Sequence, residues 1–76
     1  MNAARRKRIQ DVIEKLDELK PVIEELHDEE QEAFDNLPES FQESERGEAM
    51  EAAADNLDTA MSSMEEVLDS LNAAME

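Results

Sequence analysis

The chain has 76 residues, no cysteine, one histidine and a formal net charge of −15. The lack of cysteine excludes disulfides and thiolate metal sites, and one histidine cannot complete a conventional zinc site. A chain of this length forms one small domain that buries only about 60% of its unfolded surface, so we expect oligomerisation to reinforce it.

The charge is unevenly distributed. Six of the seven Lys and Arg residues lie in residues 1–20, whereas residues 21–76 hold one Arg and eighteen acids. The negative electrostatic field of so many acids repels nucleic acid and anionic lipid and attracts basic protein surfaces. No apolar run approaches the roughly 18 residues of a membrane span. We therefore expect a cytoplasmic protein that contacts neither nucleic acid nor membrane directly.

A heptad pattern predicts a first helix over about 3–35, with Asn2 as its N-cap. Its first row, which we label position a, contains Ile9, Leu16, Ile23, Glu30 and Leu37. Position d follows three residues later with Val12, Leu19, Leu26 and Ala33, and position e four residues later with Ile13, Lys20, His27 and Phe34. The pattern keeps its phase across Pro21, which predicts one kinked helix; two collinear helices broken at Lys20 are the alternative.

The first two turns of this helix carry four cations, Arg5, Arg6, Lys7 and Arg8. The helix macrodipole disfavours positive charge at this end, so a partner should offset it. In an antiparallel hairpin the C-terminal turns of the second helix would lie beside them, with the acids Glu65, Glu66, Asp69 and Glu76. We favour this internal pairing over a nucleic-acid arm.

The connection is expected at about 36–43. Asn36-Leu37-Pro38 ends the first helix, because the residue before a proline avoids helical angles. A short helical turn over 38–42 follows, with Ser40 and Glu43 at capping-box spacing, and Ser44 is the N-cap of the next helix.

Three apolar residues near this connection, Phe34, Leu37 and Phe41, are expected to close the hairpin tip by packing together. The alternative is that Phe41 belongs to an exposed binding surface.

The second helix is predicted over about 44–75, again from three apolar rows. Position a contains Met50, Leu57, Met64 and Leu71; position d contains Ala53, Ala60, Val67 and Ala74; position e contains Ala54, Met61, Leu68 and Met75. The small residues at position d favour close approach of the helix backbones. The sequence therefore predicts one all-α domain over 1–76, an antiparallel, coiled-coil-like helical hairpin whose wide apolar stripes favour dimerisation into a four-helix bundle.

The chain contains few residue patterns that are typical of metal or catalytic sites. Glu24 and His27 form the Glu-x-x-His pair of di-iron bundles, but Glu24 falls on the solvent side and no Glu occupies a core position of the second helix. Glu30 is the one acid at a core position and fits a register-setting role. We expect no metal, no cofactor and no catalysis.

Acids form stripes on both helices. The first helix carries Asp11, Glu18, Glu25 and Glu32 seven residues apart, and the second carries Glu48, Glu51, Asp55, Asp58, Glu65 and Asp69. Two such hairpins side by side approach the charge density of duplex DNA, about one charge per 1.7 Å. The pattern thus permits DNA mimicry.

The stretch Phe34-Asp35-Asn36-Leu37-Pro38-Glu39-Ser40-Phe41-Gln42, followed by Ser44-Glu45-Arg46-Gly47-Glu48, sits between a basic start and a heptad helix. In this it resembles a group of small acidic proteins encoded by bacteriophages and prophages. The resemblance extends over nearly the whole chain and implies a phage origin, with a site of action in the bacterial host, but it assigns no residue a function.

Charge and size suggest a non-enzymatic, phage-type accessory protein that inhibits a basic, nucleic-acid-handling host protein such as a nuclease or defence complex. The expected contacts are Glu48, Glu51, Asp55, Asp58, Glu65, Asp69 and Phe41. The alternative is a homo-oligomeric structural or adaptor bundle in which the acids serve only solubility.

Overall fold

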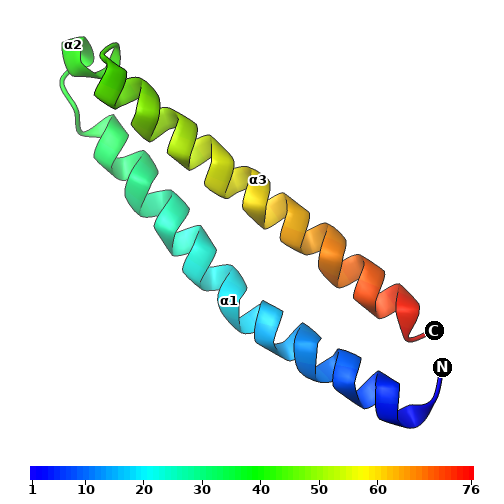
Figure 1. The fold of residues 1–76 in the computed structure, drawn as a ribbon. Helices are drawn as coiled ribbons and strands as arrows, with labels where there is room; N and C mark the ends of the chain where they lie inside the picture. Colours follow the sequence, from blue (N-terminus) through cyan, green and yellow to red (C-terminus); the bar gives the residue numbers. More distant parts are fainter.

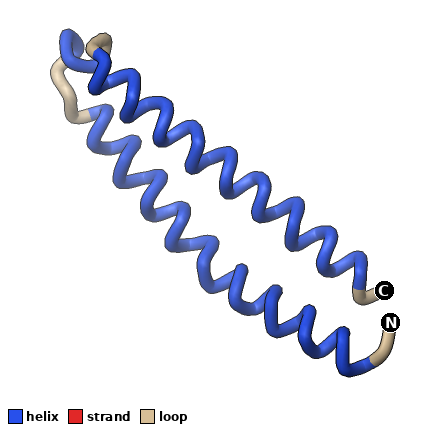
Figure 2. Tube along the Cα trace, viewed as in Figure 1, coloured by secondary structure: helices blue, strands red, loops and turns tan.

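The computed structural model describes all residues from 1 to 76 and is entirely helical. Helix α1 spans Ala3–Asp35, the short α2 spans Glu39–Gln42, and α3 spans Glu45–Ala74. The two long helices lie side by side and antiparallel, and α2 caps the turn between them (Figures 1 and 2). The Cα atoms extend over 58 × 16 × 12 Å, so the molecule is a two-helix rod. The predicted all-α class and helix boundaries are confirmed to within a residue.

Helix α1 begins and continues as its sequence predicts. The Asn2 side chain accepts a hydrogen bond from the Arg5 amide at 2.8 Å, which satisfies one of the free amides of the first turn. The helix then runs unbroken through Pro21 to Asp35. Pro21 is exposed, so the carbonyl that it leaves unpaired on this side of the helix can bond to water. The alternative of two separate helices is therefore wrong.

The hairpin turn is held by a glutamine and a cap. Gln42 donates its side-chain amide to the carbonyl oxygens of Phe34 and Leu37, each at 3.2 Å, and so ties α2 to the end of α1. Ser44 is the N-cap of α3 and accepts from the Gly47 amide at 3.3 Å, as predicted. No side chain caps α2, whose N-cap is Pro38; the capping box predicted at Ser40 and Glu43 is not formed.

The two long helices meet through two of their three apolar rows. Positions a and e are half-buried or buried along most of both helices. They include Met50, Met61 and Met64 of α3 and Met75, the C-cap of that helix. Only Ile13, Gly47, Ala54 and Leu68 are buried. The seam between the helices therefore forms a thin core.

Position d lies at the side of the seam. The exposed fractions of Val12, Leu19 and Leu26 are 45%, 51% and 47%, and Ala60 and Ala74 are also exposed. The alanine that lets the backbones approach is Ala54 at position e, which is 1% exposed. Our assignment of this role to the position-d alanines was wrong, because α1 lies against the a/e side of α3.

The termini lie together at the end opposite the turn (Figure 1). There the Arg6 guanidinium donates to the Met75 carbonyl oxygen at 3.0 Å. A cation at the C-terminal end of α3 offsets the negative end of that helix dipole. The predicted proximity of the basic start to the end of α3 is thus found, but Arg6 bonds to a backbone carbonyl and not to an acid.

Candidate binding surfaces

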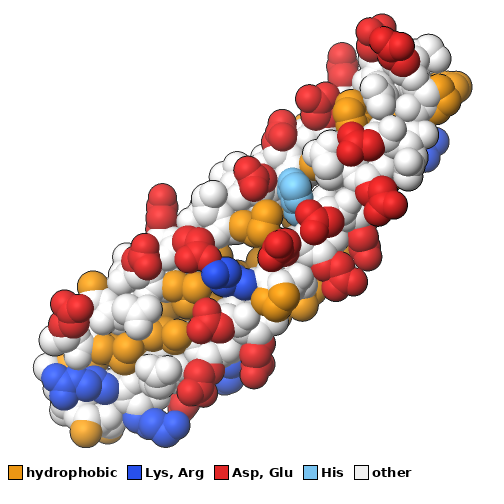
Figure 3. Space-filling model, turned by 180° about the vertical axis from the view of Figure 1, so that it is seen from behind, with side chains coloured by type: hydrophobic (Ala, Val, Ile, Leu, Met, Phe, Trp, Pro, Cys, Tyr) orange, Lys and Arg blue, Asp and Glu red, His pale blue; other side chains and the backbone are white.

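One continuous ridge of carboxylates runs along α3. It comprises Glu51, Asp58 and Glu65 at one heptad position and Glu48, Asp55 and Asp69 at the adjacent one, and all six are exposed. We call these six residues the acidic ridge. These two positions, b and f of the heptad, are neighbours around the circumference of the helix and so face the same side. The ridge therefore follows α3 for most of its length. Figure 3 shows acids along the whole rod.

A single cation of the chain touches the ridge. Lys20 of α1 forms an ion pair with Glu65, the one ion pair that joins the two long helices. Its hydrogen bond to Glu65 raises the pKa of Lys20 above the ordinary lysine value. The other ion pair, Lys7 with Asp11, lies within α1, as does the contact of His27 with Asp28. Five of the six ridge carboxylates therefore have no cation beside them.

Phe41 is the one exposed residue among the three apolar residues Phe34, Leu37 and Phe41 near the hairpin tip. Its exposed fraction is 57%, whereas Phe34 and Leu37 are half-buried. Phe41 is therefore not packed into a cluster with Phe34 and Leu37 as predicted; it lies on α2 and its ring is exposed to solvent. This placement fits the alternative that Phe41 belongs to a binding surface.

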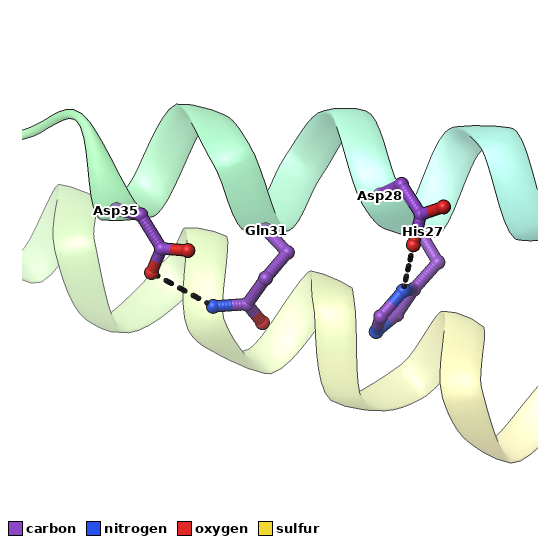
Figure 4. Close-up of polar contacts among 4 residues, drawn as sticks. All are labelled: His27, Asp28, Gln31 and Asp35. Carbon is purple, nitrogen blue, oxygen red and sulfur yellow. Dashed lines mark hydrogen bonds and ion pairs between the residues drawn. The ribbon is translucent and has the colours of Figure 1, made fainter.

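The polar residues considered for chemistry do not converge. His27 Nδ1 lies 3.1 Å from Asp28 Oδ1, and Gln31 donates to Asp35 at 3.0 Å, both along α1 (Figure 4). His27 forms no hydrogen bond or ion pair with Glu24 or Glu30. No group of three or more His, Asp or Glu side chains is arranged to hold a metal ion.

A second surface is apolar and lies along one side of the seam. The position-d rows of α1 and α3 flank shallow grooves, one lined by Arg5, Arg8, Ile9, Val12 and Leu71, the other by Ser63, Glu66, Val67, Ser70 and Leu71. The grooves share Leu71, which places Val12 and Val67 on the same side of the rod. Antiparallel helices that meet through positions a and e have this property, because equivalent heptad positions then fall on the same side.

This side, formed by positions d and the adjacent positions g of α1 and α3, is the apolar face. Val22, at position g, adds to it with an exposed fraction of 48%, close to that of Val67. The hairpin thus presents two distinct surfaces, one acidic and one apolar.

Neither long helix contains a stretch with the length and hydropathy required to cross a bilayer. No protein-family model, curated protein or solved structure matches the chain.

Proposed function

We propose that this hairpin is a non-catalytic binding protein that engages a basic, nucleic-acid-handling protein through its acidic ridge. The observation that carries the proposal is the row of five exposed ridge carboxylates without a cation beside them. Unpaired carboxylates in a row attract a complementary basic surface and accelerate its association.

The charge density supports a nucleic-acid-binding protein as the target. A rod 58 Å long with a net charge of −15 carries about one net charge per 4 Å, and two rods side by side carry about one per 2 Å. Duplex DNA carries one per about 1.7 Å. A groove that binds a nucleic-acid backbone would therefore accept this rod by the same electrostatics. The resemblance to small phage proteins suggests host nucleases or defence complexes as the target class.

The test compares two variants with the same change in net charge. In the first, Asp55, Asp58 and Asp69 of the ridge are changed to Lys; in the second, Glu18, Glu25 and Glu32 on the outer side of α1 are changed to Lys. Immobilised protein is exposed to bacterial lysate across a salt series, and retained proteins are identified by mass spectrometry. Purified captured nucleases are then assayed for inhibition.

We expect the original chain to retain basic nucleic-acid-handling proteins that are released as salt rises, because exposed charge pairs are screened. The ridge variant should lose them and the α1 variant should retain most of them. Equal loss of captured proteins in both variants would show that capture depends on net charge and not on the acidic ridge. Undiminished capture by the ridge variant would refute it.

The second candidate function is that of a self-assembling structural or adaptor hairpin that forms a four-helix bundle. The observation that favours it is the apolar face, where Val12, Leu19 and Leu26 are about half exposed. In that case neutralisation of the acidic ridge would leave the biological activity intact, whereas polar substitutions at Leu19 and Leu26 would abolish it.

A further inference from the structure

The apolar face differs from the rest of the rod in its charges. Glu29 is the only acid at a d or g position of either long helix, although the chain has 22 acids. Four of the seven Lys and Arg residues lie at these positions: Arg5, Arg8, Lys15 and Arg46. A surface that served only solubility would carry acids on all sides. Their exclusion from one side indicates that this side is covered by another surface.

The covering surface must be apolar and must complement both Lys15 and Glu29. These two residues lie on α1 seven residues before and seven residues after Val22, and neither has an ionic partner within the hairpin. The face is therefore self-complementary about Val22. A second copy turned end for end would place Lys15 of each chain beside Glu29 of the other, and Val22 against Val22.

We infer that two copies of the chain pack through their apolar faces as an antiparallel dimer, with α1 on α1 and a two-fold axis at Val22. Each hairpin tip then lies at the other copy's termini. Leu19 and Leu26, one on each side of Val22, meet across the axis, and the small residues at positions d and g of α3 permit close approach. The broad side measures 58 × 16 Å between Cα extremes, about 900 Å², close to the roughly 800 Å² per partner of a stable interface.

The parallel alternative, with both tips at the same end, lacks this complementarity. It would place α1 of each copy over α3 of the other. The d and g positions of α3 contain no acid, and their one cation is Arg46 at the tip. Lys15 and Glu29 would then both remain unpaired at the interface.

The dimer is independent of the proposed binding function. The acidic ridge lies at heptad positions away from d and g, so it stays exposed when two apolar faces meet. A monomeric chain that still binds a basic protein would refute the dimer alone, and a dimer that binds no basic protein would refute the proposed function alone.

A charge swap tests the arrangement. The variants are Lys15→Glu, Glu29→Lys and the double variant, and the dimer dissociation constant is measured by sedimentation equilibrium, with circular dichroism to verify folding. Each single variant creates two like-charge pairs across the axis and should weaken the dimer by about tenfold. The double variant restores opposite charges and should return to the original affinity.

The single variants also distinguish the pairing of Lys15 with Glu29 across the dimer from a general effect of net charge on association. Glu29→Lys reduces the overall repulsion between two acidic chains, as does the control Glu18→Lys on the outer side of α1. The inference requires that Glu29→Lys weakens the dimer while Glu18→Lys does not. Dimers strengthened equally by both, or a double variant no better than the singles, would overturn it.

Cysteine substitution fixes the orientation, since the chain has no cysteine of its own. Val22→Cys should form a covalent dimer under mild oxidation. Val12→Cys should not, because ten residues at about 1.5 Å per residue separate it from the axis. Crosslinking of Val12→Cys as fast as Val22→Cys, or a monomer at millimolar concentration, would refute the antiparallel dimer.

Discussion

Gly47 provides a sharp test of the hairpin turn, because two physical effects predict opposite results for Gly47→Ala. Helix propensity favours alanine by about 1 kcal/mol within a helix. The structure opposes it: a Cβ on Gly47 would lie 2.5 Å from the carbonyl oxygen of Phe41 and closer still to that of Gln42. Both obstacles are backbone atoms, which cannot move away by rotating a side chain.

The expected magnitude follows from these two terms. Overpacking of a closed site costs about 1–3 kcal/mol, which exceeds the gain in propensity. We expect a net loss of about 1 kcal/mol, or about 4–8 °C in Tm for a domain of this size. The assay is thermal unfolding followed by circular dichroism at one fixed protein concentration, since association makes Tm depend on concentration.

A matched control is Ala52→Gly, at an exposed position of the same helix. It should lower the stability by about 1 kcal/mol through propensity alone. An increase in Tm for Gly47→Ala, equal and opposite to the loss in this control, would show that α2 does not pack against the start of α3.

Two further perturbations test the seam between the helices. Ala54→Leu should destabilise the hairpin by about 1–3 kcal/mol because position e faces α1. Ala52→Leu, at an exposed position on the outer side of α3, should not, and equal effects in urea unfolding would contradict the assigned rows. Lys20 has a raised pKa in the folded chain through its hydrogen bond to Glu65, so its contribution to stability is present below the unfolded lysine pKa of about 10.4 and is lost as pH rises through the folded value. Lys20→Gln should therefore lower Tm near neutral pH, and the difference should shrink as pH rises through the folded pKa of Lys20; a difference that does not shrink at high pH would exclude the ion pair as its source.

Periodicity and capping chemistry predicted most of the fold. Asn2 and Ser44 are side-chain caps whose effect is local, so the helix starts could be located from a few adjacent residues. The heptad pattern identified three apolar rows on each helix, but positions d and e are both neighbours of position a. Which of them meets the other helix depends on how the two helices rotate against each other, and no local pattern specifies that rotation.

The candidate surfaces, like the fold, could be predicted from the sequence only in part. The acidic ridge could be predicted because exposed acids at heptad spacing must share a side of α3. The exposure of Phe41 could not, because it depends on how Gln42 orients α2 against the end of α1. One signal for the apolar face was available in the sequence: acids are almost absent from positions d and g.

The chain contains no cysteine, so its sulfur atoms belong to five methionines, and four of these, Met50, Met61, Met64 and Met75, lie in the seam. Their flexible thioethers fill an irregular seam well. Conversion to the sulfoxide would replace these apolar contacts with a polar, chiral group in the thin core between the helices. The packing of the hairpin is thereby coupled to oxidants, and reductases that act on methionine sulfoxide would reverse the effect.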